Sequence, residues 1–125
     1  MPAGMQEYLR IVNSTKGTLL ASRAEIADCF RKRLVGLLGR RALDPGSALW
    51  LFPSNSIHTI GMRFPIDVVM LSRNATVVKV CAGVRPYSVL WPNFQAQSVL
   101  ELPANAIARS DTAAGDLLKI EIAQL

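Results

Sequence analysis

The apolar residues of this chain recur mainly in short runs with the character of β-strands. These runs are rich in β-branched and aromatic residues and are separated by turn-forming pairs such as Lys16–Gly17, Pro45–Gly46, Arg73–Asn74 and Gly115–Asp116. Runs of this kind predict strands, here over residues 8–12, 18–27, 48–52, 66–71, 76–84, 98–102 and 117–122. The runs 66–71 and 76–84 flank a short turn and predict a β-hairpin.

One segment has helical spacing instead. After Asp28, a residue type suited to an N-cap, the apolar residues Phe30, Leu34, Leu37 and Leu38 recur as on one face of a helix that would end at Gly39. Residues 103–112 predict only a helical turn. The pattern therefore predicts a mostly β (α+β) fold: about six to eight mainly antiparallel strands in a curved or barrel-like sheet, with one main amphipathic helix.

Length and composition set the organisation that we expect. A chain of 125 residues, half of them hydrophobic and 18% charged, fits one small domain over residues 1–125 with a core of its own. Residues 1–20 lack the pattern of a signal peptide, and no run approaches the roughly 18 apolar residues of a membrane span. We therefore expect a cytoplasmic protein without a membrane span. Cys29 and Cys81 are expected to be free thiols, with a single disulfide between them as the alternative.

The net charge of +5 is concentrated in one segment. Six basic and two acidic residues between Arg23 and Arg41 give it a charge of +4. Such a segment could meet nucleic acid or an anionic membrane face, but solvation is the ordinary explanation for Lys and Arg on a helix surface. The segment has no recognised nucleic-acid motif, and only 6% of the chain is aromatic, which argues against a nucleic-acid partner.

Candidate chemistry is concentrated between residues 57 and 67. This stretch holds the only histidine, His58, followed by Thr59, Met62 and Asp67. Asp67 falls within the predicted strand 66–71, on a face with apolar neighbours, so its carboxylate needs a partner. One alternative is a structural latch in which Asp67 accepts hydrogen bonds from the preceding loop. The other is a His58–Asp67 pair for proton transfer.

Other residues extend the list of binding candidates. Tyr87 and Trp91 lie in a loop with two prolines, and they either pack in the core or form an exposed lip for a ligand or partner. Glu101 lies within the strand 98–102 and is expected either at a solvated edge or in a paired polar site. No metal site is predicted, because one histidine and two separate cysteines do not form a usual ligand set. No cofactor is predicted either.

Four stretches together resemble the bacterial and archaeal family called domain of unknown function 192. They are residues 33–40, with Arg33 and Gly36; residues 49–52, ending in Phe52; the stretch from His58 to Val69; and Val99 to Leu102 with Gly115–Asp116. The resemblance covers about residues 21–122. Leu38 stands where the family commonly has Met, and Asn105 stands near a usual Gly. The resemblance implies a small β-rich fold and no established activity.

Three functions remain open from the sequence. The first is a ligand- or partner-binding accessory module, with a small molecule or a protein held at the 57–67 loop. Its expected binding residues are His58, Thr59, Met62, Asp67, Tyr87, Trp91 and Glu101. The second is a small enzyme with His58 as acid or base and Asp67 as its orienting carboxylate. The third is a structural or interaction protein without a pocket.

Overall fold

The structure is a computed structural model, and it describes residues 7–27 and 43–124. These residues form nine strands and one short helix. The predicted mostly β fold is therefore confirmed, with the strand boundaries within a residue or two of those expected in most cases. The amphipathic helix predicted after Asp28 lies outside the described residues, as does Cys29. Cys81 carries a free, half-buried thiol.

Seven of the strands form one sheet. In spatial order these are β6 (Val77–Val84), β5 (Ile66–Leu71), β8 (Ser98–Pro103), β3 (Ser47–Leu51), β2 (Thr18–Ala27), β1 (Glu7–Asn13) and β9 (Leu118–Gln124). All neighbouring pairs are antiparallel except β2 and β3, which run parallel. The hairpin predicted from the sequence is formed by β5 and β6.

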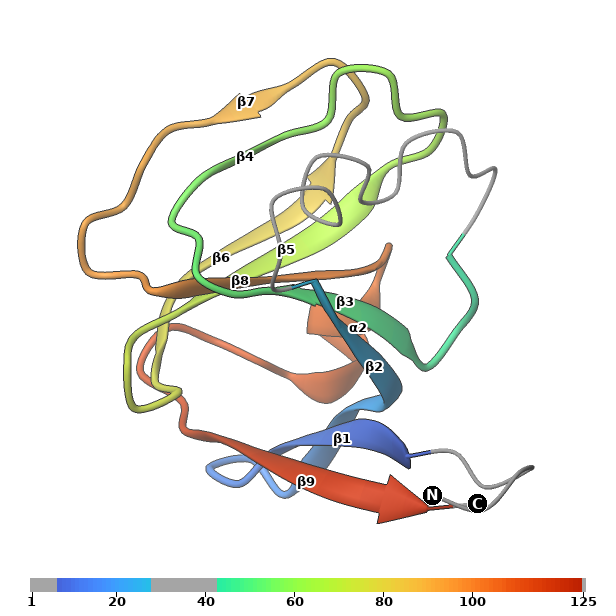
Figure 1. The fold of residues 1–125 in the computed structure, drawn as a ribbon, viewed down its shortest axis with the longest axis vertical. Helices are drawn as coiled ribbons and strands as arrows, with labels where there is room; N and C mark the ends of the chain where they lie inside the picture. The colour runs from blue at the N-terminus through green and yellow to red at the C-terminus, as the bar shows by residue number, and fades with distance from the viewer. Residues whose placement is uncertain (1–6, 28–42, 125) are drawn as a thin grey trace.

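The sheet curls so that its two outer strands approach each other (Figure 1). Thr76, before β6, pairs with Leu117, before β9, as an isolated bridge. The amide of Val77 donates to the carbonyl of Asp116 at 2.8 Å, and the amide of Leu118 donates to the carbonyl of Ala75 at 3.0 Å. These bonds join the two edges at one end of a curled half-barrel, in agreement with the curved or barrel-like sheet predicted from the sequence.

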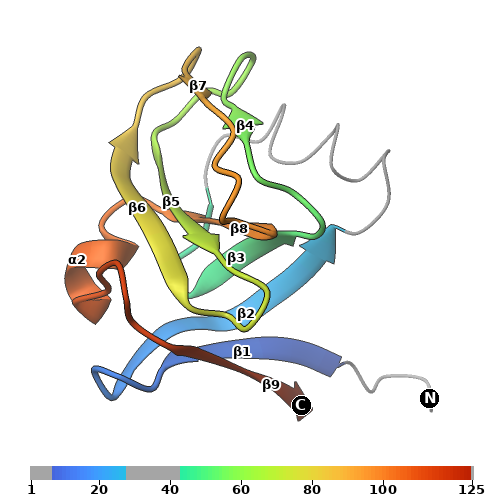
Figure 2. The ribbon, with the colours of Figure 1, turned by 90° about the vertical axis from the view of Figure 1, so that its left-hand side faces the viewer.

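Two remaining strands form a separate ribbon. They are β4 (Ile57–His58) and β7 (Val89–Leu90), which pair antiparallel. The ribbon lies at the end of the molecule opposite β1 and β9 (Figures 1 and 2). Neither strand was expected from the sequence, because two-residue strands are too short to show a periodicity. Helix α2 (Ala106–Ser110) packs against β2 and β6.

The interior of the curled sheet holds two apolar clusters. Every residue of β5 and of β8 is buried, because both strands lie at the centre of the structure with packing on both faces. The second cluster lies beneath the ribbon and includes Ile57 and Met62, with Leu90 packed against it. The ribbon is thus held to the sheet by apolar burial on its inner face.

Candidate functional site

Exposure alternates along both strands of the ribbon. His58 stands directly opposite Val89 in the β4–β7 pairing, and both are exposed, whereas Ile57 is buried and Leu90, its partner, is half-buried. Ile60, in the turn after β4, and Tyr87 and Trp91, which lie just before and just after β7, are exposed as well. We call this surface the ribbon face; it consists of His58, Ile60, Tyr87, Val89 and Trp91.

The two aromatic side chains of the ribbon face have most of their surface exposed to solvent. Tyr87 is 72% exposed and Trp91 is 81% exposed. The core-packing alternative for these two rings is therefore wrong, because the apolar side of the ribbon that meets the core is already occupied by Ile57 and Leu90. An exposed lip, the other alternative, is what the structure contains. Phe94, in the loop that follows, is 90% exposed.

Thr59 fixes the shape of the ribbon from below. It is fully buried, and its hydroxyl donates to the carbonyl of Arg85 at 2.7 Å while accepting from the amide of Ser88 at 2.8 Å. Its amide donates to the carbonyl of Ser88, and its carbonyl accepts from the amides of Met62 and Tyr87. Thr59 thus joins the loop after β4 to the loop before β7. It was expected to bind a ligand, but no part of it reaches the surface.

Asp67 is a latch, although not of the loop that was expected. Its side chain is 1% exposed. One carboxylate oxygen accepts from the amide of Gly83 and the other from the amide of Ile107, both at 2.9 Å. The carboxylate therefore joins β5 to the end of β6 and to the first turn of α2. The predicted latching of the preceding loop is wrong, because that loop is held by Thr59.

The structure does not bring His58 and Asp67 together. Both oxygens of Asp67 are used by backbone amides in the interior, whereas His58 is exposed on the outer ribbon face. A catalytic histidine needs an orienting group within hydrogen-bond reach. Among the described residues none makes a hydrogen bond with His58 that would serve this purpose.

Glu101 and Met62 are also interior. Glu101 is 4% exposed and lies on β8 between Leu49 of β3 and Val68 of β5, so a solvated edge position is wrong. Met62 is 3% exposed within the cluster under the ribbon. The seven sequence candidates therefore separate into two groups. His58, Tyr87 and Trp91 share the ribbon face, and Thr59, Met62, Asp67 and Glu101 support the fold from inside.

A buried polar cluster was missed by the sequence reasoning. Asn13 is fully buried and donates to Asp116 at 2.9 Å and to Thr112 at 3.0 Å. The ammonium of Lys16 contacts the same Asp116 oxygen at 3.0 Å, and the amide of Ala113 also donates to this oxygen. These bonds, that from Asn13 above all, lower the pKa of Asp116, although burial opposes them.

This cluster is structural. Its donors and acceptors satisfy one another and join the β1–β2 turn to the segment before β9. The sequence offered no signal for it, because Asn13 and Asp116 lie 103 residues apart. Among the described residues, no group of three or more His, Cys, Asp or Glu side chains is arranged to hold a metal ion.

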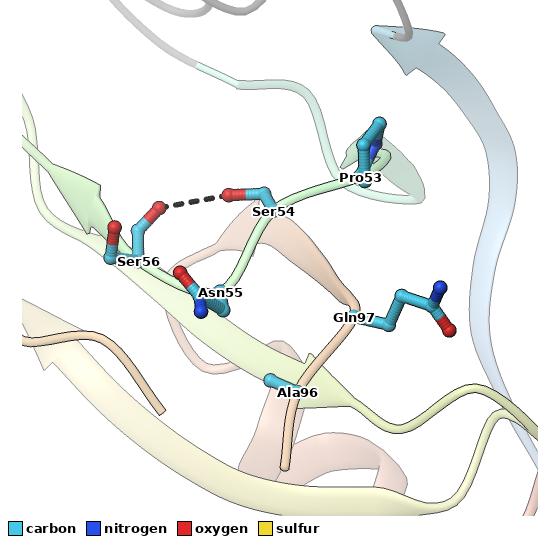
Figure 3. A pocket seen from close by; sticks show the side chains of 6 residues that line it. All are labelled: Pro53, Ser54, Asn55, Ser56, Ala96 and Gln97. Carbon is cyan, nitrogen blue, oxygen red and sulfur yellow. Dashed lines mark hydrogen bonds between the residues drawn. The ribbon is translucent and has the colours of Figure 1, made fainter. Parts of the chain in front are cut away.

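Two pockets of about 430 Å³ each open on the described surface. The first lies beside the ribbon and is lined only by uncharged residues, namely Pro53, Ser54, Asn55, Ser56, Ala96 and Gln97 (Figure 3). In it Ser54 donates to the carbonyl of Ser56, and the side chains of Asn55 and Gln97 point in different directions. The second is mainly apolar and is bordered by Arg109. Neither includes a residue of the ribbon face.

The fold and the site define a small protein with a curled β-sheet and an exposed two-stranded ribbon. The family model described as "Uncharacterized ACR", domain of unknown function 192, matches residues 11–120. The chain belongs to this family, as the resemblance predicted. No helix among the described residues is long and apolar enough to cross a membrane.

Relatives with similar sequences are archaeal proteins of the group called UPF0127. One from Thermococcus sibiricus is 31% identical over 120 residues, which is 90% of this chain and 75% of the relative. One from Pyrococcus abyssi is 35% identical over 99 residues, which is 74% of this chain and 81% of the relative.

Two solved structures share the fold. A protein of unknown function from Novosphingobium aromaticivorans has a TM-score of 0.76 at 18% identity, covering 95% of this chain and 89% of its own. A chain from Sinorhizobium meliloti, described as a candidate transcription regulator, has a TM-score of 0.78 at 19% identity, covering 96% and 98%. At these identities the likeness concerns the fold alone.

Proposed function

We propose that this chain is a binding module that contacts its partner through the ribbon face. The observation that carries the proposal is the exposure of Ile60, Tyr87, Val89 and Trp91 on one side of a short ribbon. Grouped apolar side chains in water are costly, and aromatic residues are enriched where proteins meet partners. The ribbon is also well fixed by Thr59, so these side chains are held in place before a partner binds.

The backbone of Tyr87 supports the proposal. Its φ is +62°, in the left-handed region that Gly and Asn adopt readily and bulky residues avoid. A tyrosine there costs about 1 kcal/mol. Its ring contributes little to the core in return, because the side chain is mostly in solvent. A residue that is unfavourable for the backbone and unnecessary for packing suits a contact with a partner.

The enzyme alternative has less support. It depended on a His58–Asp67 pair, and Asp67 instead accepts two backbone amides in the interior. Without the pair, His58 is one contact residue among five on the ribbon face. A purely structural protein would have no use for exposed aromatic side chains, so the third alternative does not account for Tyr87 and Trp91.

A photo-crosslinking side chain at position 89 tests the proposal in living cells. Val89 is 52% exposed at the centre of the ribbon face, and the control position is Ile122 on β9, which is 71% exposed at the far end. We expect discrete adducts from position 89 and none of the same kind from position 122. Equal labelling from both positions, or no adduct from position 89, would count against a binding role for the ribbon face.

A further inference from the structure

Charge is unevenly distributed over the described surface. Residues 52–97 contain the ribbon and are all described, and their only carboxylate is that of Asp67. Asp67 is buried and its oxygens are already occupied. The same stretch contains four arginine or lysine residues, namely Arg63, Arg73, Lys79 and Arg85. Arg63 and Arg85 lie on the loops that lead to the ribbon, whereas Arg73 lies in the β5–β6 turn, which is bonded to the segment before β9 at the far end. Within residues 52–97 no carboxylate is exposed.

Two of these cations flank the ribbon face. Arg85 follows β6, and its carbonyl accepts the hydroxyl of Thr59. Arg63 follows Met62, whose amide donates to the carbonyl of the same Thr59. Both arginines are exposed, and neither forms an ion pair with another described residue. The ribbon face is thus an apolar, aromatic surface whose two connecting loops each carry an arginine without an ion-pair partner in the part of the chain that the structure describes.

From these observations, and resting on the proposed function, we propose that the ribbon face docks on the surface of an anionic lipid bilayer. Trp and Tyr favour the boundary between headgroups and acyl chains, because each has an apolar ring and a polar atom. Trp91 and Tyr87 would enter this boundary with Ile60 and Val89. The arginines would then lie close to lipid phosphates, and each one would raise the membrane-binding constant by about fivefold.

The shape of the site favours a bilayer over an acidic peptide. A peptide is usually held in a groove or added to a sheet edge. The ribbon-face side chains line neither of the two pockets of about 430 Å³ described above, and they are exposed instead. Each ribbon strand is only two residues long, so its edge offers few backbone groups to a peptide strand. A bilayer needs neither feature, only protruding apolar side chains beside positive charge.

Sedimentation with lipid vesicles tests this inference on the purified chain. We expect binding to vesicles of equal parts phosphatidylglycerol and phosphatidylcholine, and little binding to phosphatidylcholine alone. Binding should fall steeply between about 0.05 M and 0.5 M salt. Trp91→Ala should weaken it by about tenfold or more, and Arg63→Gln and Arg85→Gln by about fivefold each. The matched controls, Ile122→Ala and Lys119→Gln on β9, should bind as the parent chain does.

The outcomes separate this inference from the proposed function. Failure to bind the anionic vesicles at low salt, or equal binding by the Trp91→Ala and Ile122→Ala variants, would overturn the lipid proposal. If the adduct from position 89 in cells is a second copy of the chain or an acidic protein, the lipid proposal fails while the ribbon face remains a binding surface. If position 89 gives no adduct and no vesicle binds, both proposals fail.

Discussion

His58 stands directly opposite Val89 across the ribbon, with both side chains on the outward face. Side chains opposite each other on paired strands lie about 5 Å apart. The only histidine of the chain therefore has an apolar neighbour on one side and solvent on the other. His58 is thus separated from the carboxylate of Asp67, which lies in the interior, and its place on the surface suits the contact role that we propose.

Substitution of Asp67 should destabilise the fold, whereas substitution of His58 should leave its stability almost unchanged. Asp67→Asn places an amide group against one of two backbone donors, Gly83 or Ile107, and we expect a loss of about 2–3 kcal/mol in the free energy of unfolding. His58→Ala removes an exposed side chain and should change it by less than about 0.5 kcal/mol. Urea denaturation measures both. Equal losses for the two variants would mean that these side chains act as a unit after all.

Thr59→Val should loosen the ribbon without changing its surface. The variant keeps the shape of the side chain but leaves the amide of Ser88 and the carbonyl of Arg85 without the hydroxyl. We expect a loss of about 1–3 kcal/mol and faster hydrogen exchange at the amide of Ser88. Ser22→Ala is the control, because its hydroxyl makes only a long, exposed bond to Gly46. A variant as stable as the parent chain would contradict the role assigned to Thr59.

Tyr87→Asn should stabilise the fold and weaken contact with the partner. Asparagine adopts a positive φ more readily, so we expect the free energy of unfolding to rise by about 1 kcal/mol. Contact with the partner should weaken because the ring is lost. Tyr87→Phe keeps the ring and the backbone conformation, and both properties should stay close to those of the parent. A loss of stability in Tyr87→Asn would show that the ring packs against the fold.

Acid should weaken the fold partly through Asp116. Its pKa is lowered in the folded state by Asn13, Ala113 and Lys16. A carboxyl group with a lowered pKa contributes stability above its unfolded pKa of about 3.9, and this contribution is lost as the pH falls through the folded value. The urea concentration at the midpoint of unfolding should therefore decrease when the pH is lowered below about 4. Asp116→Asn should flatten this part of the profile, whereas Asp111→Asn, whose side chain is 83% exposed, should not.

The strands could be predicted from the sequence because their signal is local. The runs that became β2 and β5 have the predicted boundaries, since β-branched residues and flanking turns are read within a few positions. The family resemblance was likewise confirmed. The single-domain organisation and the cytoplasmic location stay predictions.

The site could be predicted only in part, because burial depends on distant segments. The sequence placed His58, Thr59 and Asp67 in one group, although successive residues on a strand point to opposite sides. Thr59 is buried for that reason, while His58 is exposed. The partners of Asp67 come from β6 and α2, and no local pattern indicates that pairing.

The most direct test of the central claim uses the double variant Tyr87→Ser with Trp91→Ser, with Ile122→Ser as its control. Two quantities are measured on the same protein: the free energy of unfolding, and the yield of adducts from a crosslinker at position 89. We expect the free energy of unfolding to stay within about 0.5 kcal/mol per substitution and the adducts to disappear, while the control retains them. A fold weakened by several kcal/mol, or adducts that persist in the double variant, would contradict the claim that the ribbon face is a binding surface.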